Sequence, residues 1–526
     1  MEVACRSILP ASIAKQRPAT AHRTRRGAVL LVLGLLLLAG CTTNLRQWAA
    51  QGFKVGPEYD APGAFTSDRW IDTHAPQVNA IETRDGDWWT VFNDPILDDL
   101  IATASQENLG VREAGARILE ARARLAIARG SLLPQTQEAF GFFTRTQMSR
   151  TTAKPIKVPY FDDWATGFNA SWELDFWGRF RREVEASEAD VEAAVEDCRD
   201  VLVILQAEVA AAYLQTRVAQ ERIALAKRNV ELQESTLALA ELRFREGKTT
   251  KLDVTQAQEN LAATQALVPQ LEIALRESHN ALCVLLAVPP YHLDAELGFA
   301  PIPEAPSQVA VGIPAQLLAR RPDVRRAERL LAAQSARIGI AESDLYPRIA
   351  ITGTIGYESM NLPTLFQGNS LIGNVGPGFR WNILNYGRIL NNVRAEEARL
   401  EQLALRYQDV VLKANQEVEN GINRFLREQE RVRFLEQGVK AASESVELAE
   451  TQYRIGTVDF QRLVDSQRAL VQLQDQLTAA RGQVVTSLVA VYKALGGGWQ
   501  PTTASGPAGG SQPLPPPESE QAPKTP

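Results

Sequence analysis

The fold is decided by a stretch that occurs twice, as WELDFWGR at residues 172–179 and as WNILNYGR at residues 381–388. The copies lie 209 residues apart, and two further matches keep that offset: Gly247 with Gly456, and Gln258 with Gln467. Matches upstream are 213 residues apart: Val111 with Val324, Ala123 with Ala336, and Pro134 with Pro347. The chain is therefore two copies of one unit, which differ by four residues between the proline and the tryptophan.

Each unit begins with a helical segment and continues with strands. The helical segments cover about residues 95–131 and 323–344, and each has a proline at its start and ends before Pro134 or Pro347. Beyond them, apolar residues alternate with small or polar ones, as in barrel strands that face lipid and water. An amphipathic sheet over a soluble core would alternate in the same way. The apolar members are Trp164, Phe168, Trp172, Ile349, Ile351, Ile355, Tyr357, Leu371, Val375, Phe379 and Trp381.

A long helical hairpin closes each unit. Apolar and small residues recur at 3,4 spacing over 202–244, and the stripe returns 209 residues later over 411–453. A helix from about residue 180 to 244 would be about 95 Å long. Gly247 and Gly456 end these stripes and are expected to turn the chain into second helices, the first of which contains Pro269.

The sequence thus predicts an α + β membrane protein with long antiparallel helical hairpins and four β-strands per chain. A closed barrel needs about eight or more strands, so the chain must oligomerise, and the residues leave two, three or four copies open. The expected segments are a signal peptide (1–40), a lipidated N-terminal and equatorial segment (41–93), the first repeat (94–288), a Pro-rich equatorial linker (289–314), the second repeat (315–496) and a disordered Gly/Pro/Ser tail (497–526).

The N-terminus predicts export and lipidation. A basic stretch at 22–26 precedes an eleven-residue apolar run at 28–38, which is too short to span a bilayer and suits a signal peptide. The run leads into LAGC at 38–41, which resembles the lipobox of bacterial lipoproteins, so Cys41 is expected to carry a covalent lipid such as palmitate. An ordinary signal peptide or a buried apolar helix is the alternative. Thr42 stands where an inner-membrane retention signal would carry Asp, which favours the outer membrane.

Charge and reactive residues exclude several classes of protein. Residues 1–40 hold six of the 56 Lys and Arg and one of the 62 Asp and Glu, so the remaining chain has a formal net charge of −11 and is a poor nucleic-acid binder. Cys198 and Cys283 are expected to be free thiols, with a disulfide as the alternative. His74, His279 and His292 lack metal-ligand spacing, and no catalytic motif is present, so we expect no enzyme and no cofactor besides the lipid. No later stretch is expected to form a transmembrane helix.

The chain resembles the TolC-like outer-membrane factors, in the branch of NodT-type efflux lipoproteins. The resemblance runs from Cys41 to about Gly496. It implies a homotrimer with twelve membrane strands and twelve helices in a periplasmic tunnel, bound by a periplasmic adaptor (membrane fusion) protein and, through it, an inner-membrane transporter of the proton-driven RND type. The motifs that carry it are residues 55–62, Trp88-Trp89, residues 92–95 with Leu97 and Leu100, residues 172–179, residues 320–324, and Tyr453-Arg454 with Gly456.

The resemblance also implies a gate at the tunnel tip, next to the adaptor-docking turns at Gly247 and Gly456. Asp465 falls at the position of an acidic ring that lines the periplasmic constriction. Asp253 matches an acid that latches neighbouring hairpins, and Tyr453 matches a tyrosine that can bond to it. Two departures suggest different wiring: a latch arginine would fall at Val458, and a second acid at Arg462, which could instead pair with Asp465 at i,i+3.

The expected function is therefore the outer-membrane exit duct of a tripartite efflux pump for small molecules such as drugs. A tunnel for type I protein secretion or for metal efflux is the alternative, because substrate choice in such a system lies mainly with the inner-membrane transporter. A passive coiled-coil lipoprotein is disfavoured, because a filament needs no strand pairs at matching places in both repeats.

Overall fold

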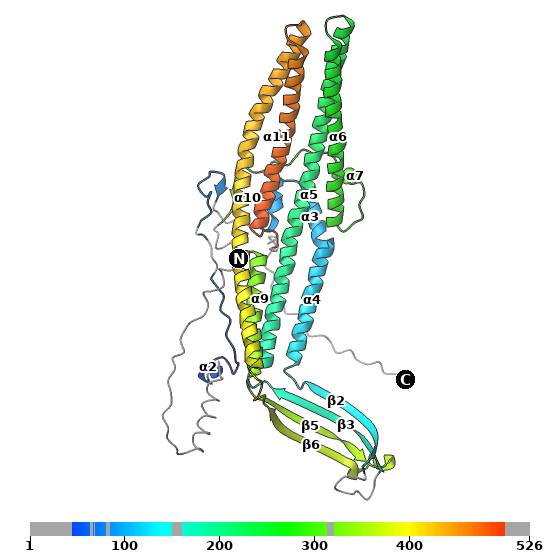
Figure 1. The fold of residues 1–526 in the computed structure, drawn as a ribbon, viewed down its shortest axis with the longest axis vertical. Helices are drawn as coiled ribbons and strands as arrows, with labels where there is room; N and C mark the ends of the chain where they lie inside the picture. The colour runs from blue at the N-terminus through cyan, green and yellow to red at the C-terminus, as the bar shows by residue number, and fades with distance from the viewer. Residues whose placement is uncertain are drawn as a thin grey trace, which may run out of the picture.

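The computed structural model describes residues 45–63, 67, 69–79, 85–149, 160–312 and 320–499. These residues form an elongated molecule, with a four-stranded sheet at one end and two helical hairpins reaching to the other (Figure 1). Cys41 and the predicted signal peptide lie outside the described residues.

The two repeats fold alike. The first comprises α3 (Pro95–Glu107), α4 (Leu109–Gly130), β2 (Thr136–Gln147), β3 (Tyr160–Leu174), α5 (Arg179–Arg245) and α6 (Lys251–Leu285). The second comprises α9 (Pro322–Ser343), β5 (Arg348–Ser359), β6 (Leu371–Arg380), α10 (Arg388–Ile455) and α11 (Phe460–Ala494). Smaller elements are α2 (Leu45–Ala50), β1 (Val78–Asn79), the 3-10 helices η1 (Asp85–Phe92), η2 (Leu362–Thr364) and η3 (Gly368–Ser370), α7 (Asp294–Leu297) and β4 (Val309–Ala310).

The first helical segment differs from the prediction, because it is two helices and not one. Asn108 ends α3 and caps α4: its side-chain oxygen accepts hydrogen bonds from Gly110 N at 2.8 Å and Val111 N at 3.2 Å. Asp94 caps α3 in the same way, accepting from Ile96 N at 3.0 Å. Each cap satisfies backbone donors that a helix start leaves unpaired.

The four long strands form one antiparallel sheet in the order β2-β3-β5-β6. The hairpins β2–β3 and β5–β6 come from different repeats and join through β3 and β5, where Phe168 lies opposite Ile355. Trp172 Nε1 donates to the Leu132 carbonyl at 3.2 Å, and Trp381 Nε1 donates to the Leu345 carbonyl at 2.9 Å. The same tryptophan therefore ties strand to helix in both repeats.

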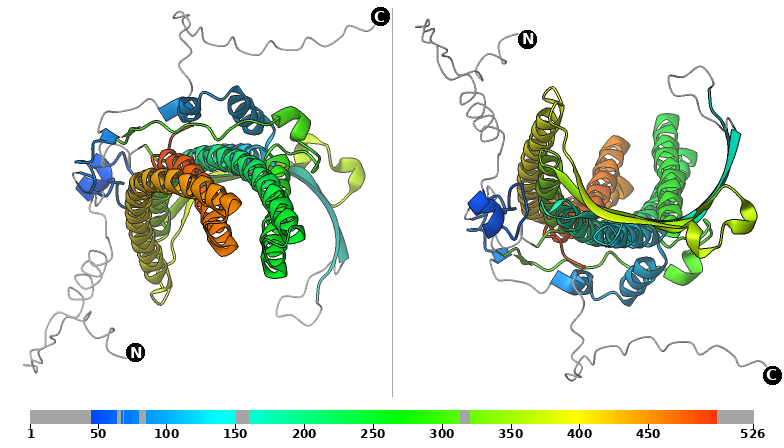
Figure 2. Two further views of the ribbon diagram at one scale, coloured as in Figure 1. Left: turned by 90° about the horizontal axis from the view of Figure 1, so that it is seen from above. Right: turned by 90° about the horizontal axis from the view of Figure 1, so that it is seen from below.

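Four helices lie above the sheet in the order of the strands below them. Neighbours in this layer are α10 with α9, α9 with α5, and α5 with α4. Figure 2 shows these helices along an arc and the sheet bowed in the same sense. The outer members of both layers are therefore α4 with β2 on one flank and α10 with β6 on the other.

The equatorial region holds the largest apolar core. It joins α3, the middle of α5, the end of α6 and the end of α11, with Leu97, Val209, Leu282 and Val491 fully buried. The linker lies against α5, where the buried Arg217 donates to the carbonyls of Leu297 at 2.9 Å and Gly298 at 2.8 Å. Its β4 pairs with β1 of the N-terminal segment, which ties the linker to that segment.

The structure bears on two expectations from the sequence, one about the cysteines and one about transmembrane helices. Cys198 and Cys283 are free thiols, as favoured. The expectation that no later stretch suits a transmembrane helix was too strict, because part of α5 is apolar enough by length and composition. Since 61% of that window is buried inside the molecule, as in the core helix of a soluble protein, it is weak evidence for a span.

Candidate functional site

The free ends of the two helical hairpins form the first candidate site, which we call the tip. Gly247 turns α5 into α6 and Gly456 turns α10 into α11, with φ of +72° and +82°. Other residues adopt this left-handed backbone at a cost, so glycine is favoured at both turns. The tip turns therefore lie where the repeat predicted them.

A small apolar cluster joins the two hairpins at the tip. The phenylalanine and tyrosine rings of Phe460 and Tyr453 lie with centroids 5.2 Å apart, and both residues are buried. The cluster draws on α5, α6, α10 and α11, so it holds both hairpins and not one. Its buried members are Ala240, Val254, Ala257, Ala449, Tyr453, Phe460, Leu463 and Val464.

Arg243 makes the main polar contact across this cluster. Its guanidinium donates to the Tyr453 carbonyl and lies 4.4 Å from the centroid of the Tyr453 ring. The Tyr453 hydroxyl is buried beside this contact, and burial raises the pKa of Tyr453. The sequence analysis did not predict a role for Arg243. One signal was present, because the matching residue of the second repeat is Gln452, so the two repeats differ in charge at this place.

The other predicted gate residues have different partners. Asp253 accepts hydrogen bonds from the hydroxyls of Thr249 and Thr250 at the start of its own helix. Asp465 accepts from Gln461 Nε2 at 2.9 Å. Across the described residues Asp253 does not bond to Tyr453, and Arg462 forms no ion pair with Asp465. Both Arg462 and Asp465 are exposed on α11.

Further polar pairs bridge the hairpins on the side of the turns that faces the sheet. Gln256 donates to Gln461 at 3.0 Å, and Gln467 donates to the Thr236 hydroxyl at 2.8 Å. Arg468 forms an ion pair with Glu259 at 3.0 Å. These contacts, with the one made by Arg243, hold the two hairpins of one chain together in this state.

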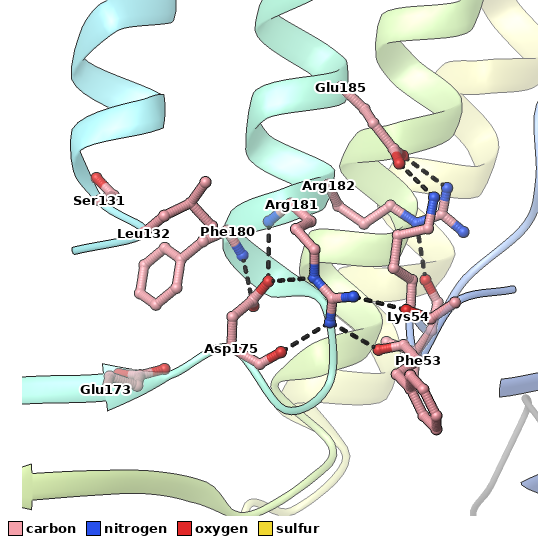
Figure 3. A network of polar contacts seen from close by, with 12 residues as sticks. Phe53, Lys54, Ser131, Leu132, Glu173, Asp175, Phe180, Arg181, Arg182 and Glu185 are labelled. Carbon is pink, nitrogen blue, oxygen red and sulfur yellow. Dashed lines mark hydrogen bonds and ion pairs between the residues drawn. The ribbon is translucent and has the colours of Figure 1, made fainter. Parts of the chain in front are cut away.

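The second candidate site is the junction where β3 passes into α5. The Asp175 carboxylate accepts from Phe180 N at 2.9 Å, Arg181 N at 3.1 Å and Arg181 Nε at 2.8 Å, so it caps the helix (Figure 3). Arg181 also donates to the carbonyls of Gly52 at 2.6 Å and Phe53 at 3.0 Å. The junction is thereby tied to the N-terminal segment 45–63, which we call the strap.

Arg182 anchors the strap more deeply, since its side chain is only 2% exposed. It donates to the carbonyls of Val55 at 3.0 Å and Gly56 at 3.2 Å, and pairs with Glu58 at 3.0 Å and Glu185 at 2.8 Å. Burial alone would raise the pKa of Glu185, but the bonds from Lys54 and Arg182 outweigh it and hold that pKa below its usual range. The strap crosses α9 so closely that a Cβ at Gly56 would lie 2.4 Å from Gly339 Cα.

Aromatic rings cover the same junction. Trp48 lies within 5.5 Å, centroid to centroid, of both Phe176 and Trp177. Trp177 stacks on Tyr346 at 4.5 Å and donates from Nε1 to the Pro347 carbonyl at 2.9 Å. Trp177 therefore packs the end of β3 onto the start of β5, across the boundary between repeats.

Comparison with known proteins now identifies the architecture. The family model for the outer membrane efflux protein matches residues 100–288 and 313–497. The chain belongs to this family. The pyoverdine export outer membrane protein OpmQ of Pseudomonas putida is 30% identical over 479 residues, which span 90% of this chain and 98% of that protein. Nodulation protein T of Rhizobium leguminosarum bv. trifolii is 30% identical over 90% of this chain and 97% of its own length.

The solved structure of the outer-membrane channel OprN has the same fold. It superposes with a TM-score of 0.81 at 31% identity, covering 85% of this chain and 100% of that one. The predicted resemblance and fold class are confirmed: the chain is an outer-membrane efflux channel whose helical hairpins form a periplasmic tunnel and whose strands contribute to an oligomeric transmembrane β-barrel.

Proposed function

We propose that three copies of this chain form the exit duct of a tripartite efflux pump that passes small molecules out of the periplasm, with no catalytic step of its own. The observation that carries the proposal is the pair of open sheet edges. β2 and β6 each have one neighbour, so each leaves a row of backbone donors and acceptors unpaired in a single chain. Pairing β6 of one copy with β2 of the next satisfies both edges.

The strand number sets the smallest ring. Two copies would give eight strands, whose interior the side chains fill, so a lumen needs at least three copies, and three give the twelve strands that the resemblance implies. A lumen is what an exit duct needs. A lipid on Cys41 would hold each strap at the membrane, close to the junction where the strap meets α5.

The tip is the proposed docking end for a periplasmic adaptor, which connects the duct to an inner-membrane transporter of the RND type. The relatives' names support a generic duct: OpmQ is named for pyoverdine export, TtgF of P. putida for toluene efflux, and CusC of Escherichia coli for cation efflux. Substrate choice in the pump would then lie with the transporter and not with this chain.

The tip also acts as the gate in this proposal. Asp465 of three copies would form an acidic ring around the axis, with Arg462 beside it, and such a ring attracts cations. In the gate that we propose, Asp253 on α6 would exchange its Thr249 and Thr250 bonds for a bond to the Tyr453 hydroxyl on α10 as the tip rearranges. A variant Tyr453→Phe with wild-type conductance and gating would contradict that role.

Two measurements test the function. Native mass spectrometry of the lipidated chain in detergent is expected to show a trimer, and a stable monomer or dimer would refute the duct. Photocrosslinkers placed in cells at Lys248 and Thr457, beside the tip turns, are expected to capture an adaptor of a proton-driven multidrug pump. Capture of a secretion-type adaptor would move the function to protein export, and capture of a metal-pump adaptor would move it to metal efflux.

A further inference from the structure

The two junctions between strand and helix have the same sequence pattern but opposite surroundings. Trp177 of the first junction corresponds to Tyr386 of the second, because both stand one residue before a left-handed glycine, Gly178 or Gly387. Trp177 is packed on Tyr346, whereas Tyr386 is 97% exposed with a φ of +52°. Its neighbours Ile383 and Leu384 are 71% and 84% exposed.

The surface that would receive Tyr386 lies on the opposite flank of the same chain. Trp177 packs on Tyr346 and Pro347, whose counterparts 213 residues earlier are Leu133 and Pro134. Leu133 is 65% exposed, and it lies between α4 and β2 on the outer flank of both layers. One flank thus carries the exposed ring of Tyr386, and the other flank carries the exposed Leu133, which corresponds to the packing partner of Trp177.

We infer that successive copies of the chain meet through a contact that repeats the α5–α9 and β3–β5 contact within one chain, with Tyr386 of one copy seated on Leu133 and Pro134 of the next. This inference rests on the proposed oligomeric duct and adds which residues meet. The internal contact is the template, because α10 and β6 stand to the next copy's α4 and β2 as α5 and β3 stand to α9 and β5.

The template fixes the strand register between copies. Within the chain, Trp172 lies opposite Ile351 and Phe168 opposite Ile355. The hairpin registers relate β3 to β6 by 209 residues and β2 to β5 by 212. Carrying the β3–β5 register over by these offsets places Asn374 opposite Thr146 of the next copy, and Gly376 opposite Thr144.

The template also predicts an ion pair between copies, in which the acidic and basic residues lie on the opposite helices from those of the internal pair. Within the chain, Arg326 of α9 pairs with Asp197 of α5 at 3.1 Å. Their counterparts are Glu113 on α4 and Arg406 on α10. Both counterparts are exposed; Glu113 pairs with Arg117 of its own helix at 2.6 Å, whereas Arg406 forms no ion pair among the described residues. Acid and base change sides, and the complementarity is kept.

The remaining ion pairs of the internal seam have no equivalent at the boundary. Arg325–Glu196, Arg329–Glu192 and Arg337–Asp190 become Arg112 with Leu405, Ala116 with Glu401 and Arg124 with Arg399. The last of these sets two arginines against each other. The boundary between copies therefore has fewer matched ion pairs than the internal seam.

Disulfide trapping in the full-length lipidated chain tests the register. Directly opposed residues of antiparallel strands have Cα atoms about 4.5–5.5 Å apart, within the reach of a disulfide. The double variant Asn374→Cys with Thr146→Cys is expected to yield a covalent trimer on mild oxidation. The matched control, Asn374→Cys with Thr144→Cys, is shifted by two residues and is expected to stay at the level of the single-cysteine variants.

A charge exchange tests the helix contact independently. Glu113→Arg and Arg406→Glu are each expected to weaken the trimer roughly two- to fivefold per contact, the range for an exposed ion pair, and the double variant to restore it. Glu120→Arg combined with Arg406→Glu is the control and is expected to give no rescue. Trimers that cross-link better in the shifted register, or no rescue by the double exchange, would overturn the inference alone. Absence of any trimer in the unmodified chain would overturn the proposed function as well.

Discussion

Replacement of Arg243 by alanine is expected to loosen the closed tip of the duct. In the structure its guanidinium, on the end of α5, donates to the Tyr453 carbonyl and covers the Tyr453 ring at 4.4 Å, on the end of α10. The contact also reaches the second tip turn, because a Cβ at Gly456 would lie 3.5 Å from the Arg243 guanidinium. Removing the side chain therefore weakens the contact between the hairpins and leaves the hydrogen bonds within each helix unchanged.

The size of the effect follows from the two contacts. A hydrogen bond from a charged donor contributes about 1.5–3 kcal/mol, and a cation–π contact at an exposed site contributes about 0.5–1 kcal/mol. Arg243 is partly exposed, so solvent screening places the sum near the low end, at about 2 kcal/mol. Since 1.4 kcal/mol is a factor of ten, the equilibrium between joined and parted hairpins is expected to shift about 30-fold in each chain.

Single-channel recording in planar lipid bilayers measures this shift as open probability and conductance. Arg243→Ala is expected to raise both, and Arg243→Lys to give an intermediate result because it keeps the charge and loses the planar fork. Arg245→Ala is the matched control, since Arg245 bonds within its own helix to the Glu241 carbonyl at 3.4 Å. An Arg243→Ala trimer with wild-type conductance and open probability would refute the reasoning.

Three further variants test the fold that supports the duct. Gly56→Ala would set a Cβ 2.4 Å from Gly339 Cα, so we expect a loss of about 1–3 kcal/mol and faster proteolysis of the strap, whereas Gly63→Ala, with open space around it, should match the wild type. Asp200, whose pKa is raised to about 6 by burial and by Asp323, binds a proton in the folded state between about pH 4 and 6, so wild-type stability falls as the pH rises through that window. Asp200→Asn should therefore raise the midpoint of thermal unfolding at pH 7.5 by an amount that disappears at pH 4. Arg217→Met leaves the Leu297 carbonyl and the Tyr213 hydroxyl without their Arg217 donor, while the Gly298 carbonyl keeps the one from Gln220, and should lower the free energy of unfolding by about 2–6 kcal/mol, seen in denaturant titration.

The repeat is what made most of the fold predictable. A helix expected over about 180–244 is found at Arg179–Arg245, because a left-handed glycine stands before it and a second one turns the chain after it. Alternation predicted β3, β5 and β6, since one face meets lipid and the other does not, and the repeat implied the fourth strand, β2. The break at Asn108 was missed because Leu109 and Val111 continue the apolar pattern across it, so only the cap geometry reveals the stop.

The tip contacts could not be predicted in the same way. Arg243 and Tyr453 are 210 residues apart, and nothing in the local pattern of either helix names the partner. Arg182 and Arg217 show the same limit: each looks like a surface residue in a helical stripe, yet each is buried because carbonyls from a distant segment receive its donors. The periodicity of a helix predicts which of its faces is buried. It does not predict which backbone carbonyls of distant segments accept hydrogen bonds from that face.

The most informative positions are those at which the two repeats disagree. At the seam within the chain, the basic residue is Arg326 on α9 and the acidic residue is Asp197 on α5. At the boundary between copies the order is reversed: the acidic residue is Glu113 on α4, and the basic residue is Arg406 on α10. If the α4 of another copy took the place of α9 on α5, Glu113 would face Asp197. If a foreign α10 took the place of α5 on α9, Arg406 would face Arg326. Like charges disfavour both wrong pairings, whereas the correct boundary and the correct internal seam each join opposite charges. A chain built from two similar repeats has two similar helix contacts, which could be mispaired during assembly. The exchange of charge between these contacts favours the correct neighbour for each helix.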